Sequence, residues 1–552
     1  MQILIPMSGF GERFRRVGYK VPKPLIIVDE LRFIEHVVNM FSKNDFFIFI
    51  CNKQHLNNKD WKLEELLNKI TPKSKILGIE PHKYGPIHAV LKAKDLINNN
   101  EPIVVNYCDF TCYWNWEKFK EEVEKNDYLG ALPAYKGFHP HSLGTTNYAY
   151  IKEKNNFLID IKEKEPFTEN RINEYASSGT YYFSKGSILI NSCEEVIKRN
   201  LHINGEYYVS LAYKILAEKH KNIFIYPLQH FMQWGTPEDL KEYQEWSKIF
   251  HKLTINDNEN SIIDGTLIIP MAGLGKRFLK EGYKKIKPLI EVSGKPMISQ
   301  AIKDLPLHND NIFVVRKDMK DIKKIKEILY EERAECKIIT LDKVTNGQAK
   351  TVLEGVKVLE DSKIKSKFNK PTTISACDNG VLFNKQKLKT FLDNKEIDII
   401  VWGYKNFINA SRNPEMYGWI DCDDTGKIRK VSVKKPINND LSKPIIIGTF
   451  TFKNINQLKF TLEELISLNI KVNDEFYVDS CINIAIENGL NCHYFEVDNF
   501  LCWGTPDDLK TFEYWQSCFH KWKYHKYRIE KDNHIPQKKI RELEEKIYKF
   551  KN

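Results

Sequence analysis

The sequence lacks the features of membrane-embedded, exported and disulfide-rich proteins. None of its apolar runs approaches the ~20 residues that a membrane-spanning helix needs. The first residues, "MQILIPMSG", have the pattern of a buried strand and lack the charged, apolar and small-residue regions of a signal peptide. The 11 cysteines form no CxxC pair, and most stand in apolar surroundings, as buried reduced thiols do. We therefore expect a cytoplasmic protein without a transmembrane segment.

Over most of the chain, positively and negatively charged residues nearly balance. Lysine and arginine number 84 against 73 aspartates and glutamates, a net charge of +11, and much of the excess falls in residues 521–552. We interpret this basic tail as a solvated helix that packs on the C-terminal domain. The alternative is a contact with acidic partners or a membrane surface. Because the rest of the chain is close to balanced, we expect no nucleic-acid partner.

What the sequence does contain is a duplication. Seven motifs recur in the same order, and the numbers of the matched residues differ by 262 to 269. The pairs are Pro6 and Pro270, Lys23 and Lys287, Gly85 and Gly347, Asp109 and Asp378, Gly179 and Gly448, Glu206 and Glu475, and Trp234 and Trp503. A period this long makes each copy a whole domain. We expect domains at residues 1–250 and 265–520, a polar linker at 251–264 and a basic helical tail at 521–552.

Each copy alternates short β-branched runs with helical patterns. In the first copy we expect strands at residues 2–7, 45–51 and 101–109 and helices at 32–41 and 61–70. The corresponding strands of the second copy are expected at 266–271, 311–316 and 371–378. This alternation is typical of an α/β fold with a mainly parallel sheet and helices on both faces. Ligands of such sheets gather beyond the carboxyl ends of the strands, which is where the glycine loops and the matched aspartates fall.

Both copies carry a glycine-rich nonapeptide between a strand and a helix: "PMSGFGERF" from Pro6 and "PMAGLGKRF" from Pro270. Small residues let backbone N–H groups approach a phosphate, and a helix N-terminus favours an anion; a tight structural turn is the alternative. The loop is not a dinucleotide fingerprint, because Phe14 and Phe278 stand where a third glycine is required. Neither copy has the GK-Ser/Thr of a Walker loop.

Two cations follow the loop in both copies. Arg13 or Arg277 stands just after the glycines, and Lys23 or Lys287 stands further on in "KPL". Backbone donors, a guanidinium fork and a point charge together suit a nucleoside triphosphate. Their recurrence at an identical offset favours a function over chance placement on the surface.

In these motifs the chain resembles the sugar-phosphate nucleotidylyltransferases, the family that makes nucleotide-activated sugars. The resemblance rests on "GFGERF…KPL" and "GLGKRF…KPLIEVSGKPMI", "GPIHAV" and "GQAKTV", the two "CD" strands, and "WGTPEDL" and "WGTPDDL". It covers almost all of both halves. It implies two tandem Rossmann-like nucleotidyltransferase domains, each with a mixed, mainly parallel sheet flanked by helices. It also implies transfer of a nucleoside monophosphate to a phosphorylated sugar, polyol or similar small acceptor, with release of pyrophosphate.

The resemblance assigns roles to the matched residues. Arg13 and Arg277 would steady the leaving pyrophosphate, Lys23 and Lys287 the triphosphate, Asp109 and Asp378 would bind Mg²⁺ or Mn²⁺, and Lys164 and Lys434 would bind the acceptor phosphate. The nucleotide-binding residues would be Met7, Ser8, Gly9, Gly11, Glu80 and Gly85, and Met271, Ala272, Gly273, Gly275, Asp342 and Gly347. The acceptor-binding residues would be His139, His141, Glu163, Gly179 and Glu206 in the first copy and Gly448 and Glu475 in the second.

Two departures from the family pattern concern the acceptor and the metal. The family's hydrophobic-x-Glu-Lys-Pro motif appears as "IKEKEP" with Glu163, but as "VSVKKP" with Val433, which cannot accept a hydrogen bond. The second copy therefore binds a different acceptor or has lost acceptor binding. Many family members also have a second metal-binding aspartate where this chain has Gln233 and Cys502. A carboxylate from elsewhere, or a metal site with one carboxylate, has to be assumed.

A third departure concerns the nucleobase. The family often has a glutamine five residues before the second glycine motif, where this chain has Glu80 and Asp342. A carboxylate only accepts hydrogen bonds, which suits the amino group of cytosine or the N–H edge of guanine. We therefore expect CTP first and GTP second. The alternative is that both carboxylates face water.

Two short patterns admit other interpretations. His139 and His141 could donate to the acceptor; a metal role for this HxH is disfavoured, because no further cysteine or histidine ligands accompany it. Asp421 and Asp423 form a DxD like that of glycosyltransferases, but the following "TGK" favours a hairpin turn.

Three hypotheses remain for the whole chain. The first is a bifunctional enzyme that makes precursors of surface polysaccharides, such as capsules. The second is one active half beside a nucleotide-binding regulatory half. The third, a non-catalytic scaffold, is disfavoured because both copies keep the arginine, the two lysines and the aspartate.

Overall fold

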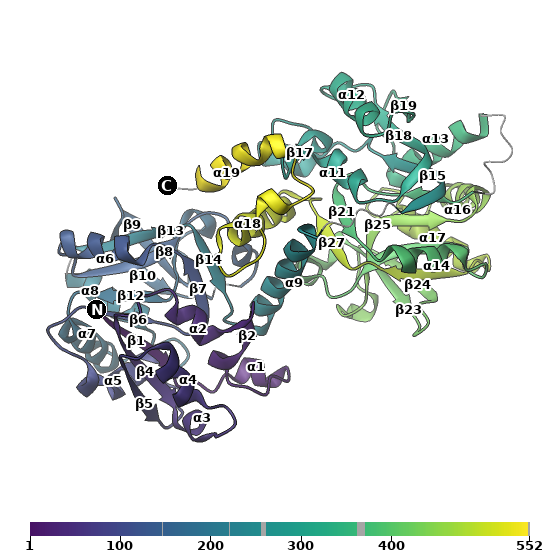
Figure 1. Ribbon diagram of the computed structural model, residues 1–552. Coiled ribbons are helices and arrows are strands. Elements are labelled where there is room, and N and C mark those ends of the chain that lie inside the picture. Colours follow the sequence, from purple (N-terminus) through teal and green to yellow (C-terminus); the bar gives the residue numbers. More distant parts are fainter. Residues whose placement is uncertain (146, 220, 256–260, 362–369, 550–552) are drawn as a thin grey trace. The chain divides into compact units, whose positions relative to one another are not determined.

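The structure, a computed structural model, describes residues 1–145, 147–219, 221–255, 261–361 and 370–549 (Figure 1). It divides into two units. The first comprises Met1–His251, Ser517–Arg528 and the chain from Glu545, and the second comprises Lys252–Gln516 and Ile529–Glu544. The expected linker at 251–264 is partly structured, because helix α9 (Pro237–Leu253) and strand β15 (Ile262–Pro270) both extend into it. Its residues 256–260 lie outside the described part of the chain.

The sheet of the first unit has a parallel half and a largely antiparallel half. Among the described residues its order is β11-β9-β10-β13-β8-β12-β6-β1-β4-β5. The parallel half contains β6 (Ile103–Asn106), β1 (Gln2–Met7), β4 (Phe46–Asn52) and β5 (Ser74–Ile79). The other half contains β12 (Thr180–Phe183), β8 (Gly130–Tyr135), β13 (Ile223–Leu228), β10 (Phe157–Glu163), β9 (Ala149–Lys154) and β11 (Tyr175–Ser177). The mixed sheet expected from the sequence is thus confirmed, but it is not mainly parallel, because antiparallel pairings prevail in one half.

Helices cover both faces of this sheet because its central strands are apolar on both sides. In β1, Ile3 and Ile5 are fully buried against one set of helices and Leu4 against the other. The first set is α2 (Phe33–Val38), α4 (Leu63–Ile70) and α6 (Trp116–Lys125); the second is α5 (Pro86–Lys92), α7 (Gly186–Lys198) and α8 (Val209–Lys219). A near-continuous apolar run is the expected pattern for such a strand. Each fully buried aliphatic side chain contributes about 1.5–3 kcal/mol relative to exposure.

The second unit repeats this plan. Within the described residues its sheet has the order β19-β18-β15-β20-β25-β22-β26, with a hairpin of β23 and β24 joined through β25. The strands are β15 (Ile262–Pro270), β18 (Leu307–Arg316), β19 (Lys337–Leu341), β20 (Thr372–Ile374), β22 (Ile399–Tyr404), β23 (Gly418–Cys422), β24 (Ile428–Val433), β25 (Ile445–Phe452) and β26 (Cys492–Glu496). One face packs on α11 (Met297–Lys303), α12 (Ile322–Glu332) and α14 (Lys385–Asp393), and the other on α13 (Gln348–Asp361), α16 (Ile455–Ser467) and α17 (Val478–Glu487).

Small elements complete each unit near the ends of the central strands. Short helices α1 (Glu12–Arg16) and α10 (Lys276–Lys280) follow the two glycine loops, and α3 (Lys53–Asn57) and α15 (Ile408–Arg412) lie on connections. Four two-stranded ribbons pair β2 (Ile27–Val28) with β3 (Leu31–Arg32), β7 (Phe110–Tyr113) with β14 (His230–Gln233), β16 (Glu291–Val292) with β17 (Lys295–Pro296), and β21 (Asn379–Leu382) with β27 (Asn499–Cys502). The β7–β14 and β21–β27 ribbons bring the "CD" and "WGTP" motifs of each copy together.

The C-terminal tail differs from the expected solvated helix on the second domain. It begins within α18 (Pro506–Lys521), and only α19 (Ile540–Lys549) is a further α-helix in its described part. Residues 517–528 belong to the first unit, where Phe519 packs on Phe250 and Tyr527 packs on the same ring, with ring centroids 5.6 and 4.8 Å apart. Residues 529–544 belong to the second unit. Aromatic side chains therefore anchor residues 517–528 of the tail on the first unit.

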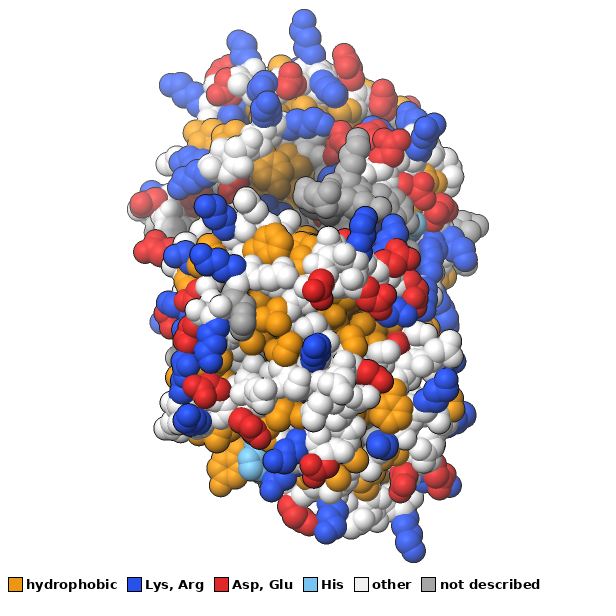
Figure 2. Space-filling view, turned by 90° about the vertical axis from the view of Figure 1, so that its left-hand side faces the viewer, with side chains coloured by type: hydrophobic (Ala, Val, Ile, Leu, Met, Phe, Trp, Pro, Cys, Tyr) orange, Lys and Arg blue, Asp and Glu red, His pale blue; other side chains and the backbone are white. Residues whose placement is uncertain are grey.

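Figure 2 shows Lys and Arg side chains interspersed with Asp and Glu side chains, and with hydrophobic ones, over the visible face. The visible face therefore carries no continuous basic patch among the residues described. In the described part of the chain, no helix combines the length and apolar character that crossing a bilayer requires.

Candidate active sites

The glycine loop of the first unit forms the floor of a cleft of about 610 Å³. The loop joins β1 to α1, and Gly11 adopts a left-handed conformation with φ +62° that suits glycine. Arg13 and Lys23 line the same cleft, as the sequence predicts. The second unit has the corresponding cleft of about 470 Å³, with Arg277 and Lys287 in its lining.

Most of the expected nucleotide-binding residues line these clefts. Ser8, Gly9, Gly11 and Gly85 line the first, and Ala272, Gly273, Gly275 and Gly347 line the second. Met7 and Met271 are buried at the ends of the preceding strands instead, with exposed fractions of 4% and 2%. Their side chains therefore belong to the core.

The lysine and the aspartate of each copy meet in an ion pair. Lys23 Nζ donates to Asp109 Oδ2 at 2.7 Å and to the Gly235 carbonyl oxygen at 2.8 Å. Lys287 Nζ makes the equivalent bonds to Asp378 Oδ2 and to the Gly504 carbonyl oxygen. These pairs bring together residues that are 86 and 91 positions apart in the chain.

The electrostatic balance keeps Lys287 charged. Burial on its own would lower the pKa of this lysine, but the charge of Asp378 and the nearby Cys377 raise it above its ordinary value. A permanent positive charge at the mouth of an anion-binding cleft is what a triphosphate site needs.

A glycine fixes the opposite wall of each cleft. Gly85 has φ +83°, and a Cβ there would lie 2.7 Å from the backbone nitrogen of Tyr207. Gly347 has φ +106°, and its Cβ would lie 2.4 Å from the backbone nitrogen of Phe476. Only glycine permits this approach, which joins the base-side loop to the loop that carries Glu206 or Glu475. Both glutamates line their clefts.

In the first unit, a second cavity of about 200 Å³ shares Arg13 and Lys23 with the cleft. Asp109, Glu163 and Lys164 line this cavity. The two hollows therefore meet at the cations and the carboxylate expected to act on the phosphates. This is the arrangement required for two phosphorylated substrates to be held end to end.

Tyr208 links the two hollows and was not anticipated from the sequence. Lys164 Nζ donates to the Tyr208 hydroxyl at 2.6 Å, and this hydroxyl donates to Glu206 Oε2. In the second unit the Tyr477 hydroxyl donates to Glu475 Oε2 at 3.0 Å, and Lys434 Nζ lies 5.4 Å from the centre of the Tyr477 ring. The sequence could have indicated this tyrosine, because the matched motifs "GEYYV" and "DEFYV" both have a tyrosine two residues after the glutamate.

The residues of the acceptor motif make different side-chain contacts in the two units. Glu163 Oε2 accepts a hydrogen bond from Ser210 Oγ at 2.6 Å, and burial raises the pKa of Glu163. Lys434 Nζ donates to the Met416 carbonyl oxygen at 2.6 Å. Gly179 lines the first acceptor cavity, and its counterpart Gly448 shares its positive φ, +80° against +95°.

The structure does not bring His139 and His141 into the acceptor cavity. Both are buried, and their rings stack with centroids 4.2 Å apart. His139 Nε2 bonds the Phe231 carbonyl oxygen at 2.6 Å, and its Nδ1 accepts from the His141 backbone N–H at 3.1 Å. His141 Nδ1 lies 3.3 Å from Asp239 Oδ1. The pair holds the loop in place, and its expected role as acceptor donors is not supported.

The two carboxylates expected to read the base also lie elsewhere. The side chain of Glu80 is 72% exposed and lies 3.0 Å from Lys53 Nζ. Asp342 is 87% exposed, with Lys317 Nζ at 4.0 Å. Neither is among the residues that line its cleft. Both carboxylates face water, so the prediction that they contact the nucleobase is not supported.

The side chain of Gln233 lies near Asp109. A Cβ on Gly235 would lie 3.6 Å from Asp109 Oδ2 and 3.0 Å from Gln233 Nε2, so both groups adjoin this glycine. Gln233 Nε2 donates to Asp239 Oδ2 at 2.9 Å, while the buried Gln233 Oε1 has no hydrogen-bond partner among the described residues. A carboxylate and an amide oxygen are ligands that Mg²⁺ accepts. The first unit therefore fits a magnesium ion held by Asp109 and Gln233.

The second unit fits this ion less well. A Cβ on Gly504 would lie 3.2 Å from Asp378 Oδ2 and 3.7 Å from Cys502 Sγ, so a thiol takes the place of the amide. Burial, with the nearby Asp508 carboxylate, raises the pKa of Cys502 well above its ordinary value, which keeps the thiol neutral. A neutral thiol is a poor ligand for a hard cation. Asp378 is the one suitable ligand that these contacts provide.

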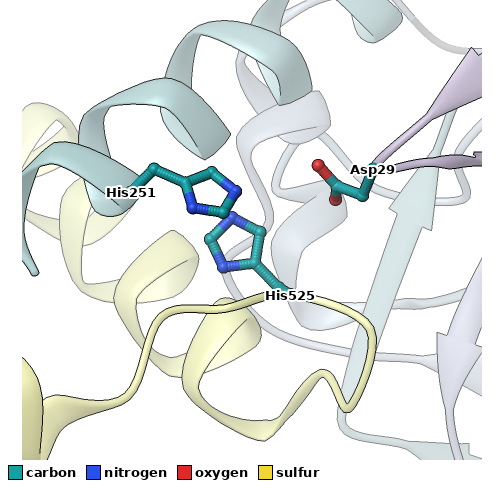
Figure 3. A group of neighbouring side chains, drawn as sticks. All are labelled: Asp29, His251 and His525. Carbon is teal, nitrogen blue, oxygen red and sulfur yellow. The ribbon is translucent and has the colours of Figure 1, made fainter.

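A separate group of metal-ligand side chains lies away from both clefts. Asp29, His251 and His525 point toward one another in the first unit (Figure 3). The Asp29 oxygens accept hydrogen bonds from the Tyr243 hydroxyl at 2.5 Å and from Ser247 Oγ at 3.0 Å. Both ring nitrogens of His525 also have hydrogen-bond partners. This group is explained as a hydrogen-bonded anchor for the tail.

Comparison with known proteins identifies the class to which these sites belong. The model of the nucleotidyl transferase family matches residues 3–240 and 267–510, one region in each unit. The chain therefore belongs to the nucleotidyl transferase family, with two copies of the family domain.

The curated relatives match about half of the chain. The bifunctional protein GlmU of Methanocaldococcus jannaschii is 26% identical over 272 residues, 49% of this chain and 60% of that protein. The catalytic subunit beta of mannose-1-phosphate guanylyltransferase of Xenopus tropicalis is 24% identical over 250 residues, 43% of this chain and 62% of that protein. The chain thus spans about 60% of the length of these relatives.

Two solved structures also match. The nucleoside-diphosphate-sugar pyrophosphorylase of Vibrio cholerae is 20% identical with a TM-score of 0.37, covering 45% of this chain and 98% of that one. The inositol-1-phosphate CTP transferase of T. maritima is 15% identical with a TM-score of 0.35, covering 47% of this chain and 96% of that one.

Proposed function

We propose that each unit transfers a nucleoside monophosphate from a nucleoside triphosphate to a phosphorylated sugar, polyol or similar small acceptor and releases pyrophosphate. The observation that carries this proposal is the meeting of two hollows at Arg13 and Lys23, with Asp109 bound to this lysine. The glycine-lined cleft would hold the triphosphate, and the cavity with Glu163 and Lys164 the acceptor. The products would be precursors of surface polysaccharides, as the family resemblance predicts.

The chemistry requires positioning rather than a base. An acceptor phosphate oxygen forms a bond to the α-phosphorus while the bond from that phosphorus to the β-bridging oxygen breaks, and pyrophosphate leaves with its electron pair. The attacking phosphate is already anionic at neutral pH, so no proton has to be removed. The barrier is lowered by holding the reactants in line and by neutralising the developing charge.

The charged residues divide this task between them. Lys164, tied to the Tyr208 hydroxyl, faces the acceptor phosphate, and Arg13 faces the pyrophosphate. Lys23, which is held by Asp109, would place its charge beside the α-phosphate of the triphosphate. A bound Mg²⁺ on Asp109 and Gln233 would supply further neutralisation of the phosphates. Arg277, Lys287, Asp378 and Lys434 would act in the same way in the second unit.

The identities of the triphosphate and the acceptor are best tested together. CTP, followed by GTP, remains the proposed donor, although Glu80 and Asp342 no longer support it. His82 and Lys83 line the first cleft, and their counterparts Val344 and Thr345 line the second. Because these linings differ, we propose that the two units differ in their preferred substrates.

The test is a pyrophosphate-release screen. Four triphosphates are crossed with glucose, mannose and N-acetylglucosamine 1-phosphates and inositol phosphate, using wild type, Asp109→Asn and Asp378→Asn. Each substitution should lower the rate with its own substrate pair by on the order of 10²–10³. The exposed Asp95→Asn serves as the matched control. If neither substitution changes turnover of any pair, the proposed mechanism is wrong.

A second candidate function follows from Cys502. Since this thiol replaces a magnesium ligand of the first unit, the second unit could bind a nucleotide without turning it over. In that case only Asp109→Asn would abolish pyrophosphate release, and Asp378→Asn would leave every substrate pair unchanged.

A further inference from the structure

The backbone around the acceptor-motif lysine has the same geometry in the two units. The backbone N–H of Lys164 donates to the Tyr148 carbonyl oxygen at 2.8 Å, and that of Lys434 donates to the Tyr417 carbonyl oxygen at 3.0 Å. Both lysines have a left-handed backbone, with φ of 60° and 62°. Because the local geometry is the same, the preceding residues also correspond: Glu163 in the first unit and Val433 in the second.

Two neighbouring positions change together with this glutamate. Glu163 pairs across the strands with Ala149, and Val433 pairs with Gly418 in the same way. The helix packed against them begins one residue before Ser210 in the first unit, at Val209, and one residue before Asp479 in the second, at Val478. The trio Ala149, Glu163 and Ser210 therefore corresponds to Gly418, Val433 and Asp479.

The three differences between the units compensate one another in volume and charge. In the first unit the small Ser210 donates its hydroxyl to the Glu163 carboxylate. In the second unit the carboxylate of Asp479 fills the space in front of Gly418, where a Cβ would lie only 2.2 Å from Asp479 Oδ2. An alanine at 418 would collide with this carboxylate, so the loss of the methyl group and the gain of the aspartate belong together.

We propose that Asp479 supplies the acceptor-binding carboxylate that Val433 has lost, so that the second unit binds the hydroxyl groups of a phosphorylated acceptor from α17 instead of from β24. This inference rests on the nucleotidyl transfer proposed above. Of the two alternatives that the sequence left open for the second unit, a different acceptor or lost acceptor binding, it favours the first.

The charges around Asp479 support a binding role. Burial raises the pKa of Asp479 to about 6, although the Lys434 ammonium acts to lower it. Burial likewise lowers the pKa of Lys434, with Asp479, Glu475 and Asp378 acting against this effect and Arg277 reinforcing it. A carboxylate and an ammonium group that are both poorly solvated are costly to the fold and are typical of functional sites.

The relocation has a consequence for specificity. Lys434 keeps the backbone position of Lys164, so we expect the acceptor phosphate to bind in the same region of both units. The carboxylate, however, approaches from the start of a helix rather than from a strand, and it therefore meets a different hydroxyl group. We expect the two units to prefer acceptors that differ in the position or orientation of a hydroxyl group.

The experiment measures the second unit alone, in the Asp109→Asn protein, with the best pair from the pyrophosphate-release screen. Asp479→Ser should raise the KM for the phosphorylated acceptor roughly 10- to 100-fold, the effect of losing a hydrogen bond to a charged group. The KM for the triphosphate should stay within about twofold. Asp424→Ser, on the exposed turn between β23 and β24, is the matched control and should change neither value.

Two further variants separate binding from folding. Adding Gly418→Ala and Val433→Glu to Asp479→Ser rebuilds the trio of the first unit and should recover most of the lost acceptor affinity. Gly418→Ala alone should displace the carboxylate and raise the acceptor KM, but it should add little to Asp479→Ser, because the colliding group is then absent. A general folding defect would produce neither pattern.

The outcomes distinguish this inference from the proposed function. Turnover in the Asp109→Asn protein with an acceptor KM unchanged by Asp479→Ser would overturn the inference and leave nucleotidyl transfer standing. No turnover in the Asp109→Asn protein with any pair would overturn the proposed function of the second unit and this inference with it.

Discussion

His534 should make the attachment of the C-terminal tail depend on pH. Its Nε2 lies 2.5 Å from Asp304 Oδ1, and its Nδ1 lies 3.3 Å from Asp532 Oδ1. Burial opposes the charged form, but the two carboxylates outweigh it and raise the pKa of His534 to about 9. The side chain is only 13% exposed, so water screens these contacts little. His534→Gln removes the charge while keeping a polar side chain of similar length.

The size and sign of the effect follow from the two pKa values. Raising the pKa from the ordinary 6.5 to about 9 corresponds to about 3 kcal/mol of stabilisation of the folded state. Because the folded pKa is the higher one, this stabilisation is complete below pH 6.5 and is lost as the pH rises to 9. For a unit of this size, 3 kcal/mol corresponds to roughly 5–10 °C in Tm.

Thermal unfolding at pH 6 and pH 9.5 tests this reasoning. The difference in Tm between wild type and His534→Gln should be roughly 5–10 °C at pH 6 and close to zero at pH 9.5. Using this difference cancels the effects of other titrating groups. The partly exposed His493→Gln, in the same unit, is the control; because burial lowers the pKa of His493, its loss should not lower the Tm at pH 6 relative to pH 9.5. A difference in Tm that is equal at the two pH values would refute the assigned ion pair.

Other variants test the active sites. In a protein whose second unit is inactivated, Lys164→Met should raise the acceptor KM roughly 10- to 100-fold while the triphosphate KM stays within about twofold; initial-rate kinetics that show equal changes in both would contradict its role. Gln233→Ala should raise the Mg²⁺ concentration for half-maximal rate roughly 10-fold, and an unchanged value would exclude this amide as a ligand. Gly347→Ala should lower Tm, because its Cβ would lie 2.4 Å from the Phe476 nitrogen, whereas Gly273→Ala, with no atom within 4 Å, should melt like wild type. Equal melting of the two variants would count against the close backbone approach.

The sequence allowed the duplication, the fold class and the cation-lined loops to be predicted because these depend on local patterns. Alternating apolar runs predict the central strands, and β1 at Gln2–Met7 coincides with the expected range. The placement of the glycine loop and Asp109 at one edge of the sheet could also be anticipated, since they follow the carboxyl ends of the parallel strands β1 and β6.

The features that the sequence did not predict depend on the direction of side chains. His139 and His141 form an HxH pattern, but the short helix that begins at Pro140 turns both rings into the core. Asp479 could not be predicted from the acceptor motif, because Val433 lies on β24 whereas Asp479 lies on α17. The closeness of Asp479 to Gly418, on which the proposed relocation rests, depends on how the helix packs against the strand.

The central claim is that one chain contains two independent nucleotidyl transfer sites. The most direct measurement follows both preferred substrate pairs in one reaction with wild type, Asp109→Asn, Asp378→Asn and the double variant. Each single variant should lose its own product by on the order of 10²–10³ in rate and keep the other within about twofold, and the double variant should lose both. A double variant that forms either product at the wild-type rate would contradict the account.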